Sequence, residues 1–197
     1  MSTYYLIRHG KKQLTPGDPP LSQEGLIEAS LTAGFLNKKK ISGIFSSPQR
    51  RAFQTASLIA DRHKLAVKQD ERLRERMNWG DVRDQKFSDF LKIWDQTNEN
   101  RKFTPIHGRS SFQTGLDFQR FVEDIDTVNP DSEVAIVTHG GTIADFILNV
   151  FSINEIEAIQ PNFLKQKSSF IKECSITIVT LTQGHFSLKK IATTDHL

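Results

Sequence analysis

The chain has 197 residues, of which 37% are hydrophobic and 25% charged, enough apolar material for one α/β domain over residues 1–197 and too much for a disordered chain. The net charge of +3 is a mild excess that suits an acidic small ligand. No apolar run approaches the roughly 18 residues of a membrane span, and the N-terminus lacks the layout of a signal peptide. The single cysteine, Cys174, excludes an internal disulfide and fits a reducing compartment, so we expect a cytoplasmic protein without membrane partners.

The N-terminal part of the chain alternates strand and helix signals. An apolar run at Tyr4–Ile7 predicts a buried strand, and a Gly/Pro-rich loop over Thr15–Pro20 follows it. Ser22 is a candidate N-cap for a helix whose apolar positions recur at helical spacing up to Leu36. Ile41–Ser46 is the next predicted strand.

A second strand–helix pair follows directly. Ser47 and Pro48 predict the N-cap and first position of a helix with an apolar face through Ala60. Ala66–Gln69 predicts a third short strand. Residues 70–110 are polar, dotted with aromatic side chains and weakly periodic, with one helix expected near Ser88–Gln96. We therefore expect a variable insertion around 80–110 that lies over a site.

The last third of the chain completes the pattern. Ser110 or Ser111 predicts the cap of a helix that Pro130 ends, and the apolar run Val134–Val137 is typical of a buried parallel strand. A further helix follows, and then a late hairpin over 175–182 and 185–191. Strands that alternate with helices predict an α/β three-layer sandwich, with a mostly parallel sheet, helices on both faces and an antiparallel edge strand.

Basic residues stand directly after three of the predicted strands. Arg8 and His9 follow the first, Arg51 follows the second, and His139 follows the strand at Val134–Val137. Ligands bind beyond the carboxyl ends of strands in open α/β sheets, so these side chains can converge there into an oxyanion pocket for phosphate. A lone histidine at a strand end is more often a packing residue, and two histidines could also bind a metal. Without a third ligand at suitable spacing, we expect no metal site and no cofactor.

Four segments of the chain, in this order, carry a more specific pattern: Leu6-Ile7-Arg8-His9-Gly10, Ser46-Ser47-Pro48-Gln49-Arg50-Arg51-Ala52-Phe53-Gln54-Thr55-Ala56, Leu73-Arg74-Glu75 and Val137-Thr138-His139-Gly140-Gly141. The pre-helix segment over 18–25 and the ending Asp195-His196-Leu197 agree with the same pattern. Together these motifs resemble the histidine phosphatase superfamily, the family of phosphoglycerate mutases and related phosphatases, from residue 4 to the end of the chain.

The resemblance implies a role for each matching residue. His9 matches the nucleophile that becomes phosphorylated, and Glu75 matches the proton donor. Three residues match the catalytic, phosphate-holding groups: Arg8, Arg51 and His139. Arg51 is preferred over its neighbour because the pocket arginine of the family directly precedes Ala-x-Gln-Thr-Ala. Two further positions match substrate contacts, Gly140 and Thr15, the latter at a place where many members carry asparagine.

Several departures leave the function open between alternatives. Lys11 and Lys12 stand where the family commonly has other residues, and we interpret them by default as solvated loop charges. The segment after Glu75 fits the mutase pattern only loosely. We therefore expect a metal-independent phosphatase that hydrolyses small phosphomonoesters through a phosphohistidine. A phosphoglycerate mutase and a non-catalytic phosphate-binding module are the alternatives. The expected partner is a small phosphorylated substrate and not nucleic acid; a homodimer stays open.

Overall fold

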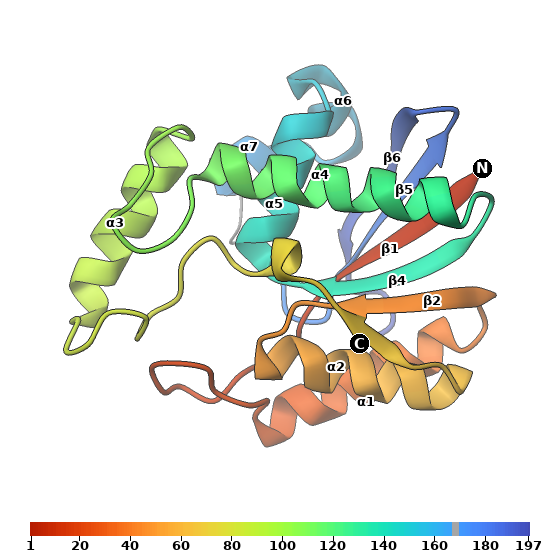
Figure 1. Cartoon of the computed structure of the whole chain (residues 1–197), viewed down its shortest axis with the longest axis horizontal. Coiled ribbons are helices and arrows are strands. Elements are labelled where there is room, and N and C mark those ends of the chain that lie inside the picture. The colour runs from red at the N-terminus through yellow and green to blue at the C-terminus, as the bar shows by residue number, and fades with distance from the viewer. Residues whose placement is uncertain (167–169) are drawn as a thin grey trace.

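The computed structural model describes residues 1–166 and 170–197, and within them six strands form one mixed sheet (Figure 1). The spatial order of the strands is β3-β2-β4-β1-β5-β6. The first four are mutually parallel, whereas β5 runs antiparallel to both β1 and β6. The strands are β1 (Ser2–Arg8), β2 (Ile41–Ser46), β3 (Val67–Gln69), β4 (Glu133–Thr138), β5 (Ile176–Thr182) and β6 (His185–Thr193). This sheet confirms the expected fold class.

Helices cover both faces of the sheet. In Figure 1, α1 and α2 lie below it, whereas α4 and α5 lie above, and α3 stands apart at the left. The α-helices are α1 (Gln23–Leu36), α2 (Arg50–His63), α3 (Phe87–Glu99), α4 (Ser111–Val128), α5 (Gly140–Val150), α6 (Ile153–Ile159) and α7 (Phe163–Gln166), and a short 3₁₀ helix, η1 (Glu71–Leu73), follows β3.

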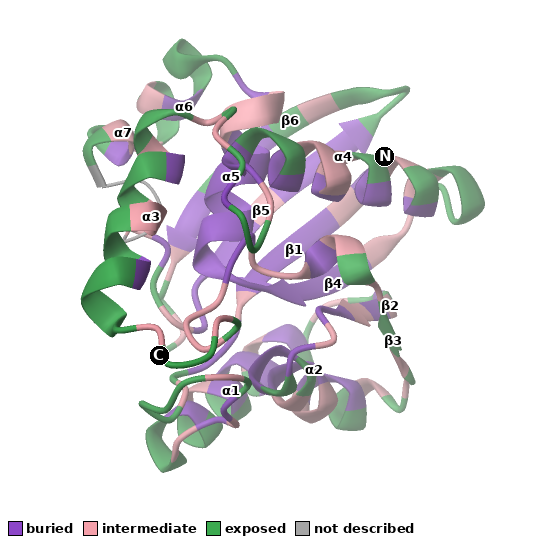
Figure 2. Cartoon of the chain, turned by 60° about the vertical axis from the view of Figure 1, so that its left-hand side comes forward, coloured by how far each residue is buried: buried purple, intermediate pink, exposed green. Residues whose placement is uncertain are grey.

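The side chains of β1 divide the core into two parts. Tyr4 and Leu6 belong to the cluster under α4 and α5, whereas Tyr5 and Ile7 belong to the cluster over α1 and α2. Alternate residues of a strand point to opposite faces, so a strand that is buried on both sides must be apolar throughout. Figure 2 accordingly shows the central strands as almost continuously buried. This explains why Tyr4–Ile7 is an unbroken apolar run.

The structure corrects two details of the sequence-based elements. Helix α2 begins at Arg50 with Gln49 as its N-cap, so the prediction of Ser47 and Pro48 as its start is wrong. The physical reason is that Ser47 still donates its backbone N–H to Val137 of β4, and its hydroxyl contacts an imidazole and the backbone N–H of Gln49 but no N–H within the helix. Helix α3 is longer than expected, and η1, α6 and α7 were not predicted, although the capping box of Ser152 and Glu155 is a sequence signal for the start of α6.

The sheet topology brings three loop starts to one edge. Strands β2, β4 and β1 are neighbours and parallel, so their carboxyl ends lie side by side. The register pairs Arg8 with Thr138 and Ser46 with Val137. The residues that follow these pairs are therefore adjacent in space although they are far apart in the sequence.

Candidate active site

His9 follows β1 and is held in one tautomer by its own loop. Its Nδ1 lies 2.7 Å from the carbonyl oxygen of Gly10, which can only accept a hydrogen bond. The proton is therefore on Nδ1, and the lone pair is on Nε2, 3.0 Å from the Nε of Arg51. Burial, followed by the charges of Arg51 and Arg8, lowers the pKa of His9 well below 6.5. The ring is thus a neutral base with a directed lone pair, which is the form that a nucleophilic imidazole needs.

Arg51 lies in the first turn of α2 with its guanidinium buried against His9. Its Nη2 donates to Asn78 Oδ1 at 3.3 Å, and its Nη1 lies 3.7 Å from a carboxylate oxygen of Asp18. Nη1 is buried and makes no hydrogen bond with the described residues, so it has a donor to offer to an oxyanion. The neighbouring Arg50 is exposed. Burial lowers the pKa of the Arg51 guanidinium, against the opposing charges of Glu75 and Asp18.

His139 caps the N-terminus of α5 and faces His9. The centroids of the two imidazole rings are 5.1 Å apart, although 130 residues separate them in the sequence. The Nε2 of His139 lies 2.8 Å from the hydroxyl of Ser47, and its buried Nδ1 has no partner among the described residues. Burial and the neighbouring Arg51 lower the pKa of His139 well below 6.5, so this ring is also neutral at pH 7.

Arg8 is the last residue of β1 and is anchored on the segment before β5. Its Nη1 donates to the carbonyl oxygen of Ile171 at 2.6 Å, and its Nη2 pairs with the carboxylate of Glu173. Its Nε is buried and unpaired among the described residues. Burial is the main cause of the lowered pKa values of His9 and His139, and the Arg8 charge adds to it at both rings.

Glu75 follows η1, and its carboxylate lies against the N-terminus of α5. It accepts hydrogen bonds from the backbone N–H of Gly141 at 3.0 Å, the hydroxyl of Thr142 at 3.2 Å and the backbone N–H of Arg76 at 3.1 Å. A Cβ at position 141 would lie 2.5 Å from Glu75 Oε1 and 2.7 Å from the ring of Trp94. The second glycine of the His-Gly-Gly motif is therefore needed to admit the Glu75 carboxylate.

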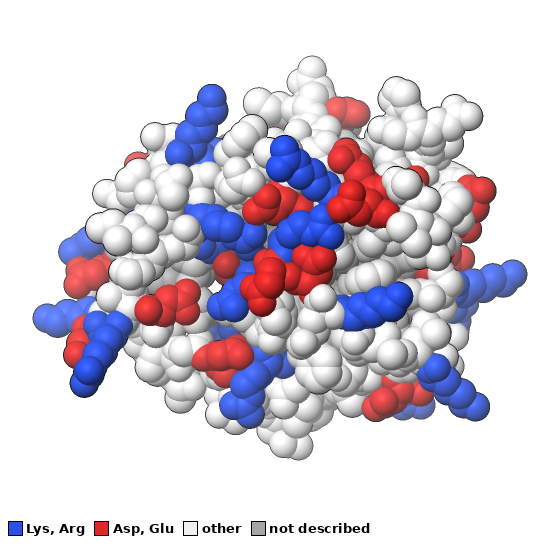
Figure 3. Space-filling view, in the orientation of Figure 1, with Lys and Arg blue, Asp and Glu red and all other residues white. Residues whose placement is uncertain are grey.

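A polar cavity of about 200 Å³ opens beside Glu75. Residues from η1, the loops around α3 and the start of α2 line it: Gln49, Arg74, Glu75, Arg76, Asn78, Asp81, Gly108 and Arg109. Part of the expected insertion thus borders the site. Figure 3 shows that basic and acidic side chains are interspersed on the face of the molecule that it presents.

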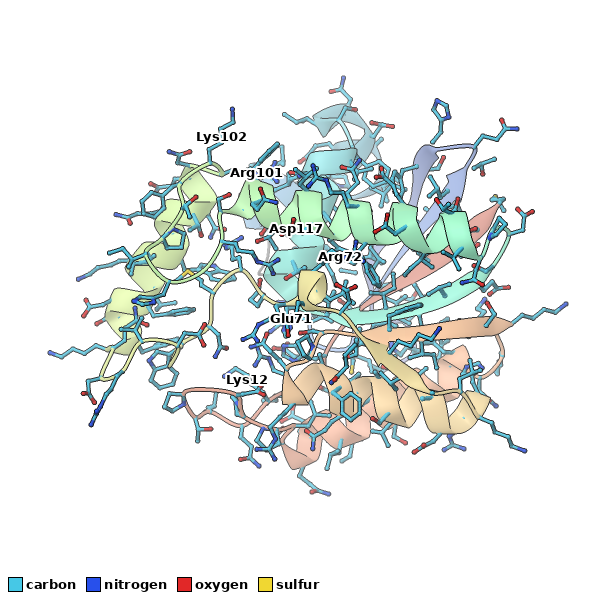
Figure 4. The ribbon with its side chains drawn as sticks, in the orientation of Figure 1. Lys12, Glu71, Arg72, Arg101, Lys102 and Asp117 are labelled. Atoms are coloured by element: carbon cyan, nitrogen blue, oxygen red, sulfur yellow. The ribbon has the colours of Figure 1, made fainter. Side chains whose placement is uncertain are left out.

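The remaining predicted positions differ in where the structure places them. Gly140 is the first residue of α5, where backbone N–H groups lack an intrahelical acceptor. Thr15 is exposed in the loop after β1, and its substrate contact stays a prediction. Lys11 is exposed and pairs with Glu24, as expected of a solvated charge. Lys12 is half-buried, and burial, Arg51 and Arg8 lower its pKa, so the default interpretation does not fit it (Figure 4).

Sequence reasoning missed the residues that support the central side chains. Ser47 contacts His139, Asn78 and Asp18 contact Arg51, and Gln49 accepts the backbone N–H of Glu75 at 3.4 Å. Ser47 and Gln49 stand directly after a predicted strand, which was an available signal. Asn78 had none, because it lies in the irregular stretch after Glu75.

Residues 1–166 and 170–197 contain neither a metal-ligand cluster nor a membrane-spanning helix. No group of three or more His, Cys, Asp and Glu side chains gathers there as a metal site requires. None of the helices in these ranges is long and apolar enough to cross a membrane.

Comparisons with known proteins agree with the geometry. A family model of the histidine phosphatase superfamily (branch 1) matches residues 4–194. The chain is 32% identical over 155 residues to a putative phosphoserine phosphatase 2 of Hydrogenobacter thermophilus, covering 73% of this chain and 75% of that one. It is 34% identical over 98 residues to a 2,3-bisphosphoglycerate-dependent phosphoglycerate mutase of Thermoplasma acidophilum, covering 46% and 48%.

Solved structures share the whole fold. A phosphoserine phosphatase from Entamoeba histolytica in complex with 3-phosphoglyceric acid superposes with a TM-score of 0.77 at 22% identity, covering 100% of both chains. A mycobacterial glucosyl-3-phosphoglycerate phosphatase in complex with inorganic phosphate gives 0.75 at 23% identity, covering 99% of both. At this identity the likeness shows the fold alone. With the match over residues 4–194, the chain belongs to the histidine phosphatase superfamily.

Proposed function

We propose that this protein is a phosphatase that hydrolyses small phosphomonoesters through a phosphohistidine on His9. The observation that carries the proposal is the arrangement around His9: Nδ1 is tied to Gly10, and Nε2 presents its lone pair beside the Arg51 guanidinium and the His139 ring. A neutral imidazole next to buried cations combines a nucleophile with the charge that binds its target.

In the first half of the reaction, the His9 Nε2 lone pair forms a bond to phosphorus while the ester P–O bond breaks. The Nε–H of Arg51, which donates to Nε2 in this structure, turns to a phosphate oxygen as the substrate enters. Glu75, which takes up a proton as the phosphate anion binds beside it, gives that proton to the departing alcohol oxygen. Such proton transfer contributes roughly 10²–10⁴-fold to the rate.

In the second half, Glu75 takes a proton from water, and the resulting hydroxide attacks phosphorus. The P–N bond breaks, the electron pair returns to Nε2, and inorganic phosphate leaves. His9 is then neutral again and Glu75 is again protonated, so both half-reactions balance without any other reactant. Using one carboxyl group as acid and then base follows from microscopic reversibility.

Cationic and dipolar groups stabilise the transferred phosphoryl group in both steps. Arg51 and Arg8 supply fixed positive charge, and Gly140 supplies a backbone N–H at the start of α5. His139 is neutral without substrate because burial and Arg51 lower its pKa. A phosphate dianion placed against the ring raises that pKa, so His139 gains a proton as the anion binds. A positively charged His139 then faces the charge that develops in the transition state.

Two observations favour hydrolysis of a small polar ester. The cavity beside Glu75 has a volume of about 200 Å³ and is lined by polar side chains. Its size and polarity suit a small polar leaving group. The relative from Hydrogenobacter thermophilus, of which the match covers 75%, is named a putative phosphoserine phosphatase. A mutase must shield the phosphohistidine from water and rebind its product, and the residues after Glu75 match the mutase pattern only loosely.

A panel of phosphorylated metabolites, tested with wild type and His9→Ala in the presence of a chelator, examines the proposal. We expect phosphate release from one or more small esters, abolished by His9→Ala and insensitive to the chelator. Conversion of 2- to 3-phosphoglycerate without phosphate release would make the protein a mutase. Phosphate binding with no turnover of any ester, a generic aryl phosphate included, would make it a binding module.

The proposal includes a cytoplasmic location and leaves a homodimer open. Cell fractionation examines the first, and sedimentation at several protein concentrations examines the second. Buried Cys174, whose thiol pKa is raised by burial to about 12, is an unreactive thiol that a reducing compartment tolerates.

A further inference from the structure

Directly behind Glu75, the next residue turns into the protein interior. Arg76 is 2% exposed, and its Nη1 lies 3.0 and 2.9 Å from the two carboxylate oxygens of Asp145 on α5. Its Nη2 donates to Asn98 Oδ1 of α3 at 2.5 Å, and its Cζ lies 3.8 Å from the centroid of the Trp94 ring. A charged guanidinium is thus removed from water and held by a carboxylate, an amide and an aromatic face, while its buried Nε has no hydrogen-bond partner among the described residues.

The Asp145 carboxylate is held from another side as well. The hydroxyl of Ser111, at the start of α4, donates to its Oδ1 at 2.5 Å. Arg101, in the segment between α3 and α4, donates to the backbone carbonyl of Asp145 at 3.1 Å (Figure 4). Helices α4 and α5 therefore meet at this buried carboxylate, and α3 is joined to it through the contact of Asn98 with Arg76.

This arrangement is linked to the catalytic carboxylate by geometry. Glu75 binds Gly141 on α5, and Arg76 binds Asp145, one helical turn further along the same helix. Two consecutive residues thus form hydrogen bonds with α5 at two positions that are one helical turn apart. Trp94 connects them, since it stacks on Arg76 and lies where a Cβ of residue 141 would be. Burial raises the pKa of Asp145 to about 6, and the Glu75 charge acts in the same direction.

We propose that Arg76, Asp145 and Trp94 form a positioning clamp that fixes the Glu75 carboxyl group on the N-terminus of α5 for proton transfer to the leaving group. The inference rests on the proposed function, because it takes Glu75 as the proton donor. It also gives the 80–110 segment a role, because α3 supplies the aromatic face and the amide that keep Arg76 in place. If these contacts were weakened, the phosphate pocket would stay intact, but the Glu75 carboxyl group would no longer be held in position for proton transfer.

The clamp predicts a loss that depends on the leaving group. An alkyl ester needs its departing oxygen protonated, whereas an aryl ester such as 4-nitrophenyl phosphate leaves readily as an anion. The value of kcat/KM reports the steps up to leaving-group departure. We expect Asp145→Asn to lower kcat/KM at least tenfold for a small alkyl phosphate and less than threefold for 4-nitrophenyl phosphate. Inhibition by inorganic phosphate should change less than threefold.

Two comparisons separate positioning from a general structural effect. For the alkyl phosphate, kcat/KM of the double variant Glu75→Gln/Asp145→Asn should be within about twofold of that of Glu75→Gln alone. Once the proton donor has been removed, disturbing its position causes no further loss. The control Ile147→Val, on the buried core face of α5, should shift both esters by the same factor. If Asp145→Asn does not fold, Trp94→Leu gives the same test from the aromatic side with the ion pair intact.

Equal losses on both esters for Asp145→Asn and Trp94→Leu, or multiplicative losses in the double variant, would overturn the inference while leaving the phosphatase intact. If Glu75→Gln itself slows both esters equally, the proton-donor role is refuted and the clamp with it. Absence of any His9-dependent hydrolysis would instead refute the proposed function, so these failures are distinguishable.

Discussion

Acid should destabilise this fold because His9 and His139 are buried as neutral rings. Both folded-state pKa values lie well below the ordinary 6.5, whereas the unfolded chain protonates at that value. Below pH 6.5 the unfolded state binds more protons than the folded state. The free energy of unfolding therefore keeps its full value above this pH, as far as these two rings determine it, and decreases as the pH falls. Between pH 7.5 and 5.5, each ring that stays neutral in the folded state lowers the free energy of unfolding by about 1.4 kcal/mol. The two rings together lower it by about 2.7 kcal/mol.

Asp145 acts in the opposite direction over part of this range. Burial raises its pKa from 3.8 to about 6, so the folded state takes up a proton there before the unfolded state does. Its protonation between pH 7.5 and 5.5 therefore returns about 0.8 kcal/mol of stability. The balance of these three groups alone is a net loss of about 2 kcal/mol, and His196, whose pKa is also lowered by burial, adds to the loss in the same direction.

Urea unfolding at pH 7.5 and 5.5, in phosphate-free buffer, measures this balance. His9→Gln and His139→Gln should each reduce the pH-dependent loss by about 1.4 kcal/mol, and the double variant by about 2.7 kcal/mol. His185→Gln, which removes an exposed imidazole on β6, is the matched control and should follow the wild type. If both buried-site variants retain the full wild-type dependence on pH, the two rings are not neutral in the fold, and the account of a neutral nucleophile fails.

Other substitutions probe the phosphate pocket, the carboxylate and the core. Arg51→Lys loses the planar fork beside His9, so inorganic phosphate should bind about 10–100-fold more weakly, as competitive inhibition would show; an unchanged inhibition constant would argue against Arg51 as a phosphate ligand. Gly141→Ala places a methyl group 2.5 Å from Glu75 Oε1 and should lower kcat/KM for alkyl esters at least tenfold, whereas wild-type kinetics would show that the carboxylate has room. Phe118→Ala empties a fully buried core position and should lower the free energy of unfolding by about 3–5 kcal/mol in urea; a loss below about 1 kcal/mol would contradict the packing.

The parts of the fold that sequence reasoning predicted are those with strong local signals. Tyr4–Ile7 and Val134–Val137 are unbroken apolar runs because both faces of their strands are covered, and few other structures favour such runs. Ser22 and Ser110 act as N-caps, as their spacing before apolar positions indicated. The convergence of His9 and His139 was expected because each stands directly after the carboxyl end of a predicted parallel strand.

The parts that could not be predicted depend on tertiary contacts. Ser47 and Pro48 look like a helix start, but pairing with β4 and the contact with His139 delay the helix to Arg50. Lys12 and Lys11 are chemically alike and adjacent, and only the folded loop turns one toward the arginines.

The environment of Arg76 is the clearest example. In the sequence it belongs to a polar stretch of alternating charge, where a solvent-exposed face is the ordinary expectation. Its burial depends on Asp145, which is 69 residues away, and on Trp94 in the insertion. No local sequence pattern indicates that Arg76 pairs with a residue so far away in the sequence.

A phosphatase of the kind proposed must transfer the phosphoryl group of its substrate to the His9 imidazole. The most direct measurement is rapid acid-free quenching of the enzyme during turnover of a small phosphate ester, followed by mass analysis of the peptide that contains residue 9. We predict an acid-labile, base-stable phosphate on His9, absent from His9→Ala, which should also have lost turnover. Undiminished hydrolysis by His9→Ala, or turnover with no phosphate ever found on this peptide, would contradict the account.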